Sequence, residues 1–152
     1  SRFEDGFAKA KMEWVFQVPG DNQFDVAEVE KFVPELDGAD VVQGWRVNLN
    51  YTPRRRVVTF IYRSLIRLLF GLNLKDATWV KMIRTEVVRA CPIVTDGFFG
   101  EIEILIRAKR RGARFRQVGV HTQKRVYGSS SATSLFAVLR TFFELIRFRG
   151  TL

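Results

Sequence analysis

Short apolar runs alternate with segments of helical periodicity, and this alternation limits the possible folds more than any other feature. The alternation favours an α/β fold with helices layered on a mainly parallel sheet. The length of 152 residues suits one domain with a core of its own. The apolar runs predict strands at 13–18, 39–47, near 76–82 and 113–122. The periodic segments predict helices at 3–12, 26–36, 54–71, 85 onward, 101–112 and 132–148.

Several of these helices carry sequence signals at their ends. Asp25 stands where an N-cap belongs, and Glu28 follows three residues later as a capping-box partner. Gly71 stops the helix at 54–71, which has apolar residues at helical spacing and Arg on its other side. Basic residues and Gly112 end the helix at 101–112, as the helix dipole favours.

The net charge of +9 conceals an uneven distribution along the chain. Residues 1–52 carry five basic and ten acidic side chains, whereas residues 53–152 carry twenty basic and six acidic ones. Such a positive segment favours phosphates, whether of nucleic acid, of lipid head groups or of a nucleotide. Charge alone does not choose among these partners.

Simple counts exclude a membrane span within these residues and an internal disulfide. The longest apolar stretches are interrupted by Arg and Glu, so none gives the roughly 18 consecutive apolar residues of a membrane span. The single cysteine, Cys91, excludes an internal disulfide and fits a reducing compartment. We expect Cys91 to be structural.

The segment VPGDNQFD (18–25) is an acidic turn directly after a buried strand. Asp21 and Gln23 offer oxygen ligands that can share a divalent ion with substrate phosphates. Equally, a Pro-Gly turn followed by the Asp25 cap needs no ion. The local pattern leaves both interpretations open for Asp21. Ligands of α/β sheets do collect at the carboxyl ends of strands, where this segment lies.

The segment GFFGEIE (97–103) places Glu101 and Glu103 at the start of a helix. Carboxylates in a first turn commonly serve the helix dipole, and the local pattern favours that role. The alternative is that one of them is a general base, which must reach the proton that it removes.

The segment HTQKRVYGSSS (121–131) combines His121, Lys124 and Arg125 with a Gly-Ser stretch. Backbone amides, hydroxyls and a guanidinium suit a diphosphate. A solvated basic loop has the same composition, so this motif alone decides nothing.

The order of these motifs is more specific than any one of them. GFAKAKMEWVFQVPGDNQFD, GWRVN, LLFGLNLKDATWVKMIR, DGFFGEIEILIRAKRRGARFRQVGV and HTQKRVYGSSS follow one another along the chain. From about Gly6 to Gly150, this order resembles the inverting family-2 glycosyltransferases with a GT-A fold. The branch it resembles most is that of dolichyl-phosphate mannose synthase and the polyprenyl-phosphate sugar transferases.

The resemblance implies a partial GT-A domain, Rossmann-like, with a mixed and mostly parallel sheet flanked by helices. Residues 1–152 would form the C-terminal part of that catalytic domain. The family's N-terminal half, which binds the base and ribose, would precede Ser1. We therefore expect no full activity from residues 1–152 alone.

By the same resemblance, the acidic turn corresponds to the family's Asp-x-Asp metal motif. Asp21 matches the second Asp and Gln23 matches the Gln that often follows, so both are candidate ligands of Mg²⁺ or Mn²⁺. Pro19 stands where the family has its first Asp. Asp21 is also a candidate catalytic residue.

Other positions acquire roles from the resemblance alone. Arg46, in GWR, would organise the site near the donor or acceptor phosphate. Glu101 matches the acidic position near the acceptor, with Glu103 two residues further, and both are candidate catalytic residues. The loop that clamps the diphosphate would contribute Arg125, Gly128 and Ser130.

The segment LLFGLNLKDATWVKMIR (68–84) departs from the family in its spacing. The family places its Asp and the following Lys or Arg one residue further apart than Asp76 and Lys81. We therefore expect a small loop change near Trp79, and assign no role to these three residues.

The function implied is transfer of a sugar, with inversion, from a UDP- or GDP-linked donor to a polyprenyl or dolichyl phosphate. The protein would be cytoplasmic and peripheral to a membrane, with the basic amphipathic stretches 54–70 and 132–149 on an anionic surface. The alternative is a non-catalytic basic α/β module that binds anionic lipid or nucleic acid. We do not expect nucleic acid, because no recognised motif is present and the Arg residues are spread over several elements.

Overall fold

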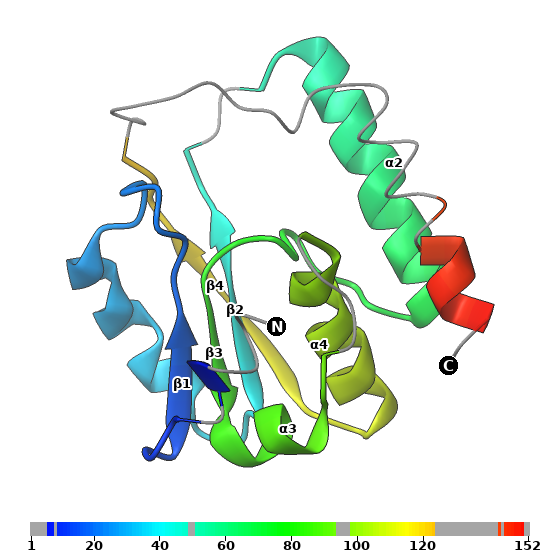
Figure 1. The fold of residues 1–152 in the computed structure, drawn as a ribbon. Helices are drawn as coiled ribbons and strands as arrows, with labels where there is room; N and C mark the ends of the chain where they lie inside the picture. The colour runs from blue at the N-terminus through cyan, green and yellow to red at the C-terminus, as the bar shows by residue number, and fades with distance from the viewer. Residues whose placement is uncertain are drawn as a thin grey trace.

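The computed structural model contains a four-stranded mixed sheet with helices packed on it (Figure 1). It describes residues 6–7, 9–48, 51–93, 98–123, 143 and 145–150. The strands are β1 (Trp14–Gln17), β2 (Val41–Arg46), β3 (Lys81–Arg84) and β4 (Phe115–Val120). The helices are η1 (Val26–Lys31), η2 (Val33–Glu35), α2 (Pro53–Phe70), α3 (Thr85–Ala90) and α4 (Phe98–Arg110). Residues 145–150 are helical as well.

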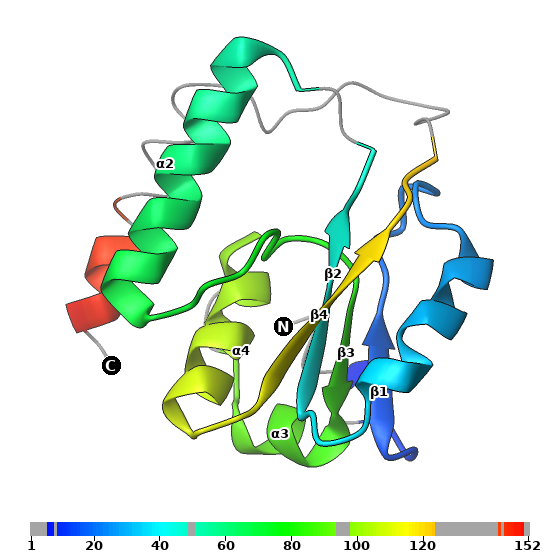
Figure 2. The ribbon, with the colours of Figure 1, turned by 180° about the vertical axis from the view of Figure 1, so that it is seen from behind.

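The strand order is β1-β3-β2-β4. β2 and β4 pair in parallel, whereas β3 pairs antiparallel with both of its neighbours. The expected α/β fold with a mixed, helix-flanked sheet is confirmed. β1, β2 and β4 share one direction, as a mostly parallel sheet requires, but the reversed β3 makes two of the three pairings antiparallel. The carboxyl ends of β1, β2 and β4 therefore meet the amino end of β3 at one edge (Figure 2).

The sheet has a separate apolar cluster on each face, because successive side chains of a strand point to opposite faces. Val41 and Ile83 belong to the cluster that packs against α2, α3 and α4. Val42 and Val80 belong to the cluster that packs under η1 and η2, around Phe32. Both faces are thus covered, as expected for an α/β layer structure.

The helix expected at 26–36 forms as two short 3-10 helices, η1 and η2. Pro34 lies in the first turn of η2, and a proline there cannot donate the hydrogen bond that would continue a single α-helix. The Asp25 cap is confirmed, since its side chain accepts from Ala27 N at 3.0 Å. Glu28 does not act as a capping-box partner. Its carboxylate accepts instead from Lys31 Nζ and from the backbone of His121.

The ends of the longer helices agree with the sequence signals. α2 begins at Pro53 and ends at Phe70, and Gly71 caps it with a left-handed φ of 67° and an N–H that donates to Arg67 O at 2.9 Å. Thr85 begins α3 as expected. Among the described residues, no helix has the length and apolar content needed to span a bilayer.

Three expected elements differ from the structure or extend beyond its described part. β3 begins only at Lys81, because Asp76 closes a turn in which its Oδ1 accepts from Thr78 N at 3.2 Å. Of the helix expected at 3–12, residues 6–7 are helical and 9–12 are not. Of the helix expected at 132–148, only 143 and 145–148 are described, and these are helical.

The close approach of β2 to the start of β3 at Gly44 can be tested by substitution. A Cβ at Gly44 would lie 2.6 Å from Val80 Cγ2 and 3.0 Å from Val80 O. We expect Gly44→Ala to lower the free energy of unfolding by about 1–3 kcal/mol in urea denaturation, because the neighbouring strand must shift. Gly20→Ala, where a Cβ meets nothing within 4 Å, is the matched control. An equal effect of the two substitutions would contradict this packing.

Candidate functional site

Three loops meet at the edge where β1, β2 and β4 end, and hydrogen bonds connect them. Gln123 N donates to Gln23 O at 2.9 Å, which joins the end of β4 to the loop after β1. Asn48 exchanges hydrogen bonds with the backbone of Thr122, each 2.9 Å long, which joins the ends of β2 and β4. The acidic turn 18–25 is thereby held beside the other strand ends.

Arg46 ends β2 at this edge and is held from two sides. Its Nε donates to Asp76 Oδ2 at 2.6 Å, and its guanidinium carbon lies 4.8 Å from the centre of the Trp79 ring. The side chain is only 16% exposed. Burial alone would lower the pKa of Arg46, but the hydrogen bond and charge of Asp76 outweigh it and raise the pKa. The charge of Asp21 adds to this effect. Arg46 is thus a fixed cation at the edge that also carries the acidic turn.

Asp76 is itself oriented by its own turn. Its Oδ1 accepts from Thr78 N at 3.2 Å and from Thr78 Oγ1 at 3.3 Å, while Oδ2 accepts from Arg46. The turn precedes Trp79, whose ring lies beside the Arg46 guanidinium. The loop change expected near Trp79 stays a prediction.

Lys81 and Glu101 form an ion pair beneath the edge. Lys81 Nζ lies 3.4 Å from Glu101 Oε2, and the exposed fractions of the two side chains are 0% and 19%. Burial lowers the pKa of Lys81 despite the opposing charges of Glu101 and Asp76. The pair joins the central strand β3 to the first turn of α4, and it sets where the Glu101 carboxylate lies.

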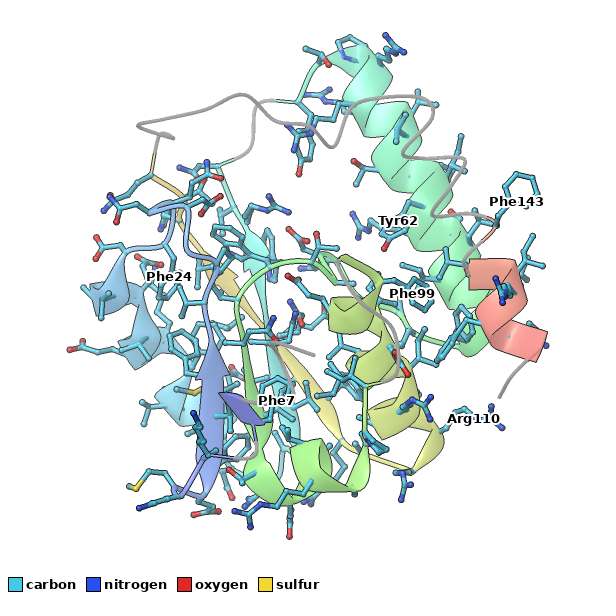
Figure 3. The ribbon with its side chains drawn as sticks, in the orientation of Figure 1. Phe7, Phe24, Tyr62, Phe99, Arg110 and Phe143 are labelled. Carbon is cyan, nitrogen blue, oxygen red and sulfur yellow. The ribbon has the colours of Figure 1, made fainter. Side chains whose placement is uncertain are left out.

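Tyr62 approaches the same carboxylates from α2, and Figure 3 shows it on the side of α2 that faces α4. Burial raises the pKa of its hydroxyl, and the charges of Glu101 and Asp76 raise it further. α2 thus brings Tyr62 into the electric field of two carboxylates of the site, although no residue of α2 is among those that line the cavity.

A cavity of about 220 Å³ opens between the end of β1 and α4. Its lining includes the Glu101 carboxylate and two residues with a buried, unpaired polar atom, Gln17 Oε1 and Trp79 Nε1. A buried polar atom without a partner costs about 1–3 kcal/mol, so both atoms favour a ligand or water with complementary groups. The remaining lining residues are Val18, Pro19 and Gly20.

A second cavity, of about 320 Å³, lies at the opposite end of β3, around Arg84 and Arg89. None of the site residues expected from the sequence lines it. We therefore place the candidate site at the smaller cavity.

The structure brings four of the expected site residues to this edge. Asp21 lies in a tight turn, with Oδ1 accepting from Gln23 N at 3.3 Å, and close enough to Arg46 to affect its pKa. The four residues are Asp21, Gln23, Arg46 and Glu101. Arg125, Gly128 and Ser130 lie outside the described residues.

Glu103, the fifth described candidate, does not line the cavity. Its side chain is fully buried, and its Oε1 lies 2.7 Å from Arg107 on the same helix. Residues two apart on a helix point in different directions, so the cavity that Glu101 lines is out of reach of Glu103. Its position fits a structural role on the buried side of α4.

The oxygen donors around Asp21 are few. In the described part of the chain, no group of three or more His, Cys, Asp or Glu residues is close enough to hold a metal ion. Pro19, at the position where the resemblance leads one to expect an Asp, lines the cavity but contributes no carboxylate. A divalent ion at Asp21 would thus need oxygens from a substrate phosphate, as Mg²⁺ commonly does.

Sequence analysis did not assign Asp76, Trp79, Lys81 or Tyr62 to a site. A signal for two of them existed, since the resemblance includes an Asp followed by a Lys or Arg at nearly the spacing of Asp76 and Lys81. For Trp79 and Tyr62 the sequence carries no such signal, because they reach the site through the loop before β3 and the packing of α2.

Comparison with solved structures identifies the fold. The chain superposes on glucosyl-3-phosphoglycerate synthase from Mycobacterium tuberculosis in complex with phosphoglyceric acid, with TM-score 0.70 and 20% identity. The complex of the same protein with Mn²⁺, UDP-glucose and phosphoglyceric acid gives TM-score 0.70 and 18% identity. These matches cover 95% of this chain and 51–52% of the other. The chain has a partial GT-A, Rossmann-like fold.

The chain spans about half the length of the solved structures it matches. No protein-family model and no curated protein matched its sequence. At this level of identity the comparison establishes the fold, and the activity rests on the site.

The Lys81–Glu101 pair can be tested by a double-mutant cycle. We expect Lys81→Met and Glu101→Gln to show a coupling of about 1–3 kcal/mol in the free energy of unfolding, because each removes the partner of a shielded charge. Lys81→Met combined with Glu86→Gln, an exposed acid on α3, should couple by less than about 0.5 kcal/mol. Equal couplings in the two cycles would contradict the pairing.

The raised pKa of Tyr62 predicts that the free energy of unfolding depends on pH in the alkaline range. Its pKa is raised in the folded state, so above pH 10 the unfolded chain loses a proton that the folded chain keeps. The free energy of unfolding should then fall as pH rises, at Tyr62 by up to about 1.4 kcal/mol per pH unit. Tyr62→Phe should remove this part of the slope in urea denaturation between pH 8 and 11. Parallel pH profiles of variant and wild type would show that the hydroxyl is not shielded.

Proposed function

We propose that this chain is part of a glycosyltransferase that uses a nucleotide-sugar donor. The observation that carries the proposal is the guanidinium of Arg46, held by Asp76 and Trp79 beside a cavity lined by Trp79 and Glu101, at the carboxyl edge of a GT-A sheet. Ligands of open α/β sheets bind at this edge. The proposal agrees with the motif order that resembles the family-2 glycosyltransferases.

The arrangement suits displacement of a nucleoside diphosphate. An acceptor oxygen would form the new bond to the anomeric carbon while the bond to the diphosphate breaks on the opposite face. Arg46 would stabilise the negative charge that develops on the leaving diphosphate, because its own position needs no rearrangement. Glu101 would take the acceptor's proton where the acceptor is a hydroxyl. Gln17 and Trp79 would meet hydroxyls of the sugar with their unpaired atoms.

Mn²⁺ or Mg²⁺ would add positive charge at the diphosphate when bound. Asp21, with Gln23 beside it, is the residue that would hold it, together with the donor's phosphate oxygens. Some of the solved neighbours are complexes with UDP and Mn²⁺ or Mg²⁺, which supports a divalent ion of this kind.

For the acceptor we propose a phosphate-bearing molecule, and a polyprenyl phosphate in particular. The motif order resembles transferases that use such lipids, and an anionic phosphate needs little help from a general base. A small phosphorylated acid is the second candidate, because the neighbouring structures hold phosphoglyceric acid. Transfer assays with the two acceptors would distinguish them.

The donor site can be tested by calorimetric titration with UDP-glucose and GDP-mannose in the presence of Mn²⁺. We expect Arg46→Gln and Asp21→Asn each to weaken binding of the preferred donor about tenfold or more, since each removes a charge next to the diphosphate. Asp37→Asn, an exposed acid remote from the edge, is the matched control. Thermal melting would verify that all variants fold. Equal binding by wild type and Arg46→Gln would refute the role of Arg46.

The second candidate function is a non-catalytic basic module, and Pro19 in place of an acidic ligand favours it. Binding of anionic polymers or vesicles that falls steeply with salt, without binding of either nucleotide-sugar, would support that alternative.

A further inference from the structure

α2 has two apolar faces, and in the part of the chain that the structure describes only one of them is covered. Its inner face, with Ile66 buried and Tyr62 partly buried, packs toward the core. Its outer face carries Phe60 with 71% of its surface exposed and Leu68 with 81% exposed. Val57 and Ile61, at 58% and 49%, lie on the same stripe, because residues three, four and seven apart share one side of a helix.

Arginines border this stripe. Arg56, Arg63 and Arg67 are exposed and follow one another at helical spacing along one edge of it. α2 contains no acidic residue over its 18 positions. The sequence predicted arginines on the outside of this helix, but it did not reveal that large apolar side chains are exposed among them.

The helical segment at 145–150 extends the same composition. It contacts the end of α2, since Phe70 and Phe148 have ring centres 6.2 Å apart and Arg149 Nη1 donates to Leu69 O. Beside that contact, Ile146 and Phe143 expose 47% and 67% of their surface, and Arg147 is exposed. Figure 3 shows Phe143 next to the middle of α2 and turned away from α4.

We propose that the outer face of α2, continued by Phe143 and residues 145–149, lies on the surface of an anionic membrane. Apolar side chains of this size would enter the boundary between head groups and acyl chains, while the arginines at their edge meet lipid phosphates. The inference stands on these exposed residues and does not depend on the proposed transferase activity.

The charge of the face argues for this occupant over two others. A second copy docked on the same face would bring two sets of arginines together without an acid on either α2 to compensate. Nucleic acid would neutralise the arginines but would leave Phe60 and Leu68 without an apolar partner. An anionic bilayer satisfies both parts of the face.

The position of α2 would also bring the membrane close to the candidate site. The covered face of this helix carries Tyr62, whose hydroxyl lies in the field of Glu101 and Asp76. One helix would thus contact lipid on one side and carry Tyr62 toward the site on the other. For the proposed polyprenyl phosphate acceptor, this is the geometry by which a lipid phosphate reaches a site above the bilayer.

The test is sedimentation of the chain with vesicles made of equal parts phosphatidylcholine and phosphatidylglycerol, without nucleotide. We expect binding to these vesicles, little binding to pure phosphatidylcholine, and at least a tenfold loss for the double variant Phe60→Ser/Leu68→Ser. Val26→Ser/Val33→Ser is the matched control, because those two valines are 74% and 60% exposed on η1 and η2. Thermal melting would verify that the serine variants fold, which we expect because the replaced side chains are exposed.

A second pair of variants tests the charge. Arg63→Gln/Arg67→Gln should weaken binding several-fold, whereas Arg110→Gln/Arg111→Gln, an equal loss of exposed charge at the end of α4, should weaken it less. No binding to the anionic vesicles, or equal losses in test and control pairs, would overturn the proposal. A dimer in analytical ultracentrifugation that Phe60→Ser/Leu68→Ser dissociates, without vesicle binding, would identify a second copy as the occupant instead. Because no nucleotide-sugar is present, a negative result leaves the proposed transferase activity unaffected.

Discussion

The buried charge of Lys81 is the constraint on which the rest of the candidate site depends. A lysine with no exposed surface, on an inner strand of a sheet, must have a partner, because an unpaired buried ammonium is strongly destabilising. Glu101 supplies that partner from the first turn of α4, so helix and sheet are joined at a defined point. The same contact holds a carboxylate at the wall of the cavity. Stability and site geometry thus come from one interaction.

The reversed strand β3 explains why so many polar groups converge at one edge. β1, β2 and β4 end there, and β3 begins there, so four loops meet instead of alternating between two edges. Asp76 and Trp79, just before β3, hold Arg46 at the end of β2. Because these contacts fix Arg46, the edge has a cation in position without a bound phosphate. Such preorganisation stabilises negative charge that develops during a reaction.

α2 connects this edge to the exterior. Most surface helices have one apolar and one polar face, and a helix that is apolar on a second, uncovered side is a sign of an interaction surface. Here the uncovered side is also cationic, and the covered side carries Tyr62 toward the site. The two faces differ in what their apolar residues contact, which periodicity along the sequence does not reveal.

The sequence alone determined the order and nature of most elements, because periodicity, caps and turn residues are local signals. Asp25, Gly71 and Thr85 marked helix ends that the structure confirms, and Asp21, Arg46 and Glu101 were expected at the edge where they lie. The tertiary structure decided the direction of β3, which depends on pairing between distant segments. It also decided that Glu103 is turned into the core and that Lys81 reaches Glu101. Such outcomes depend on contacts between residues far apart in the chain, since the free energy of burying a charge or an apolar side chain is set by what packs against it.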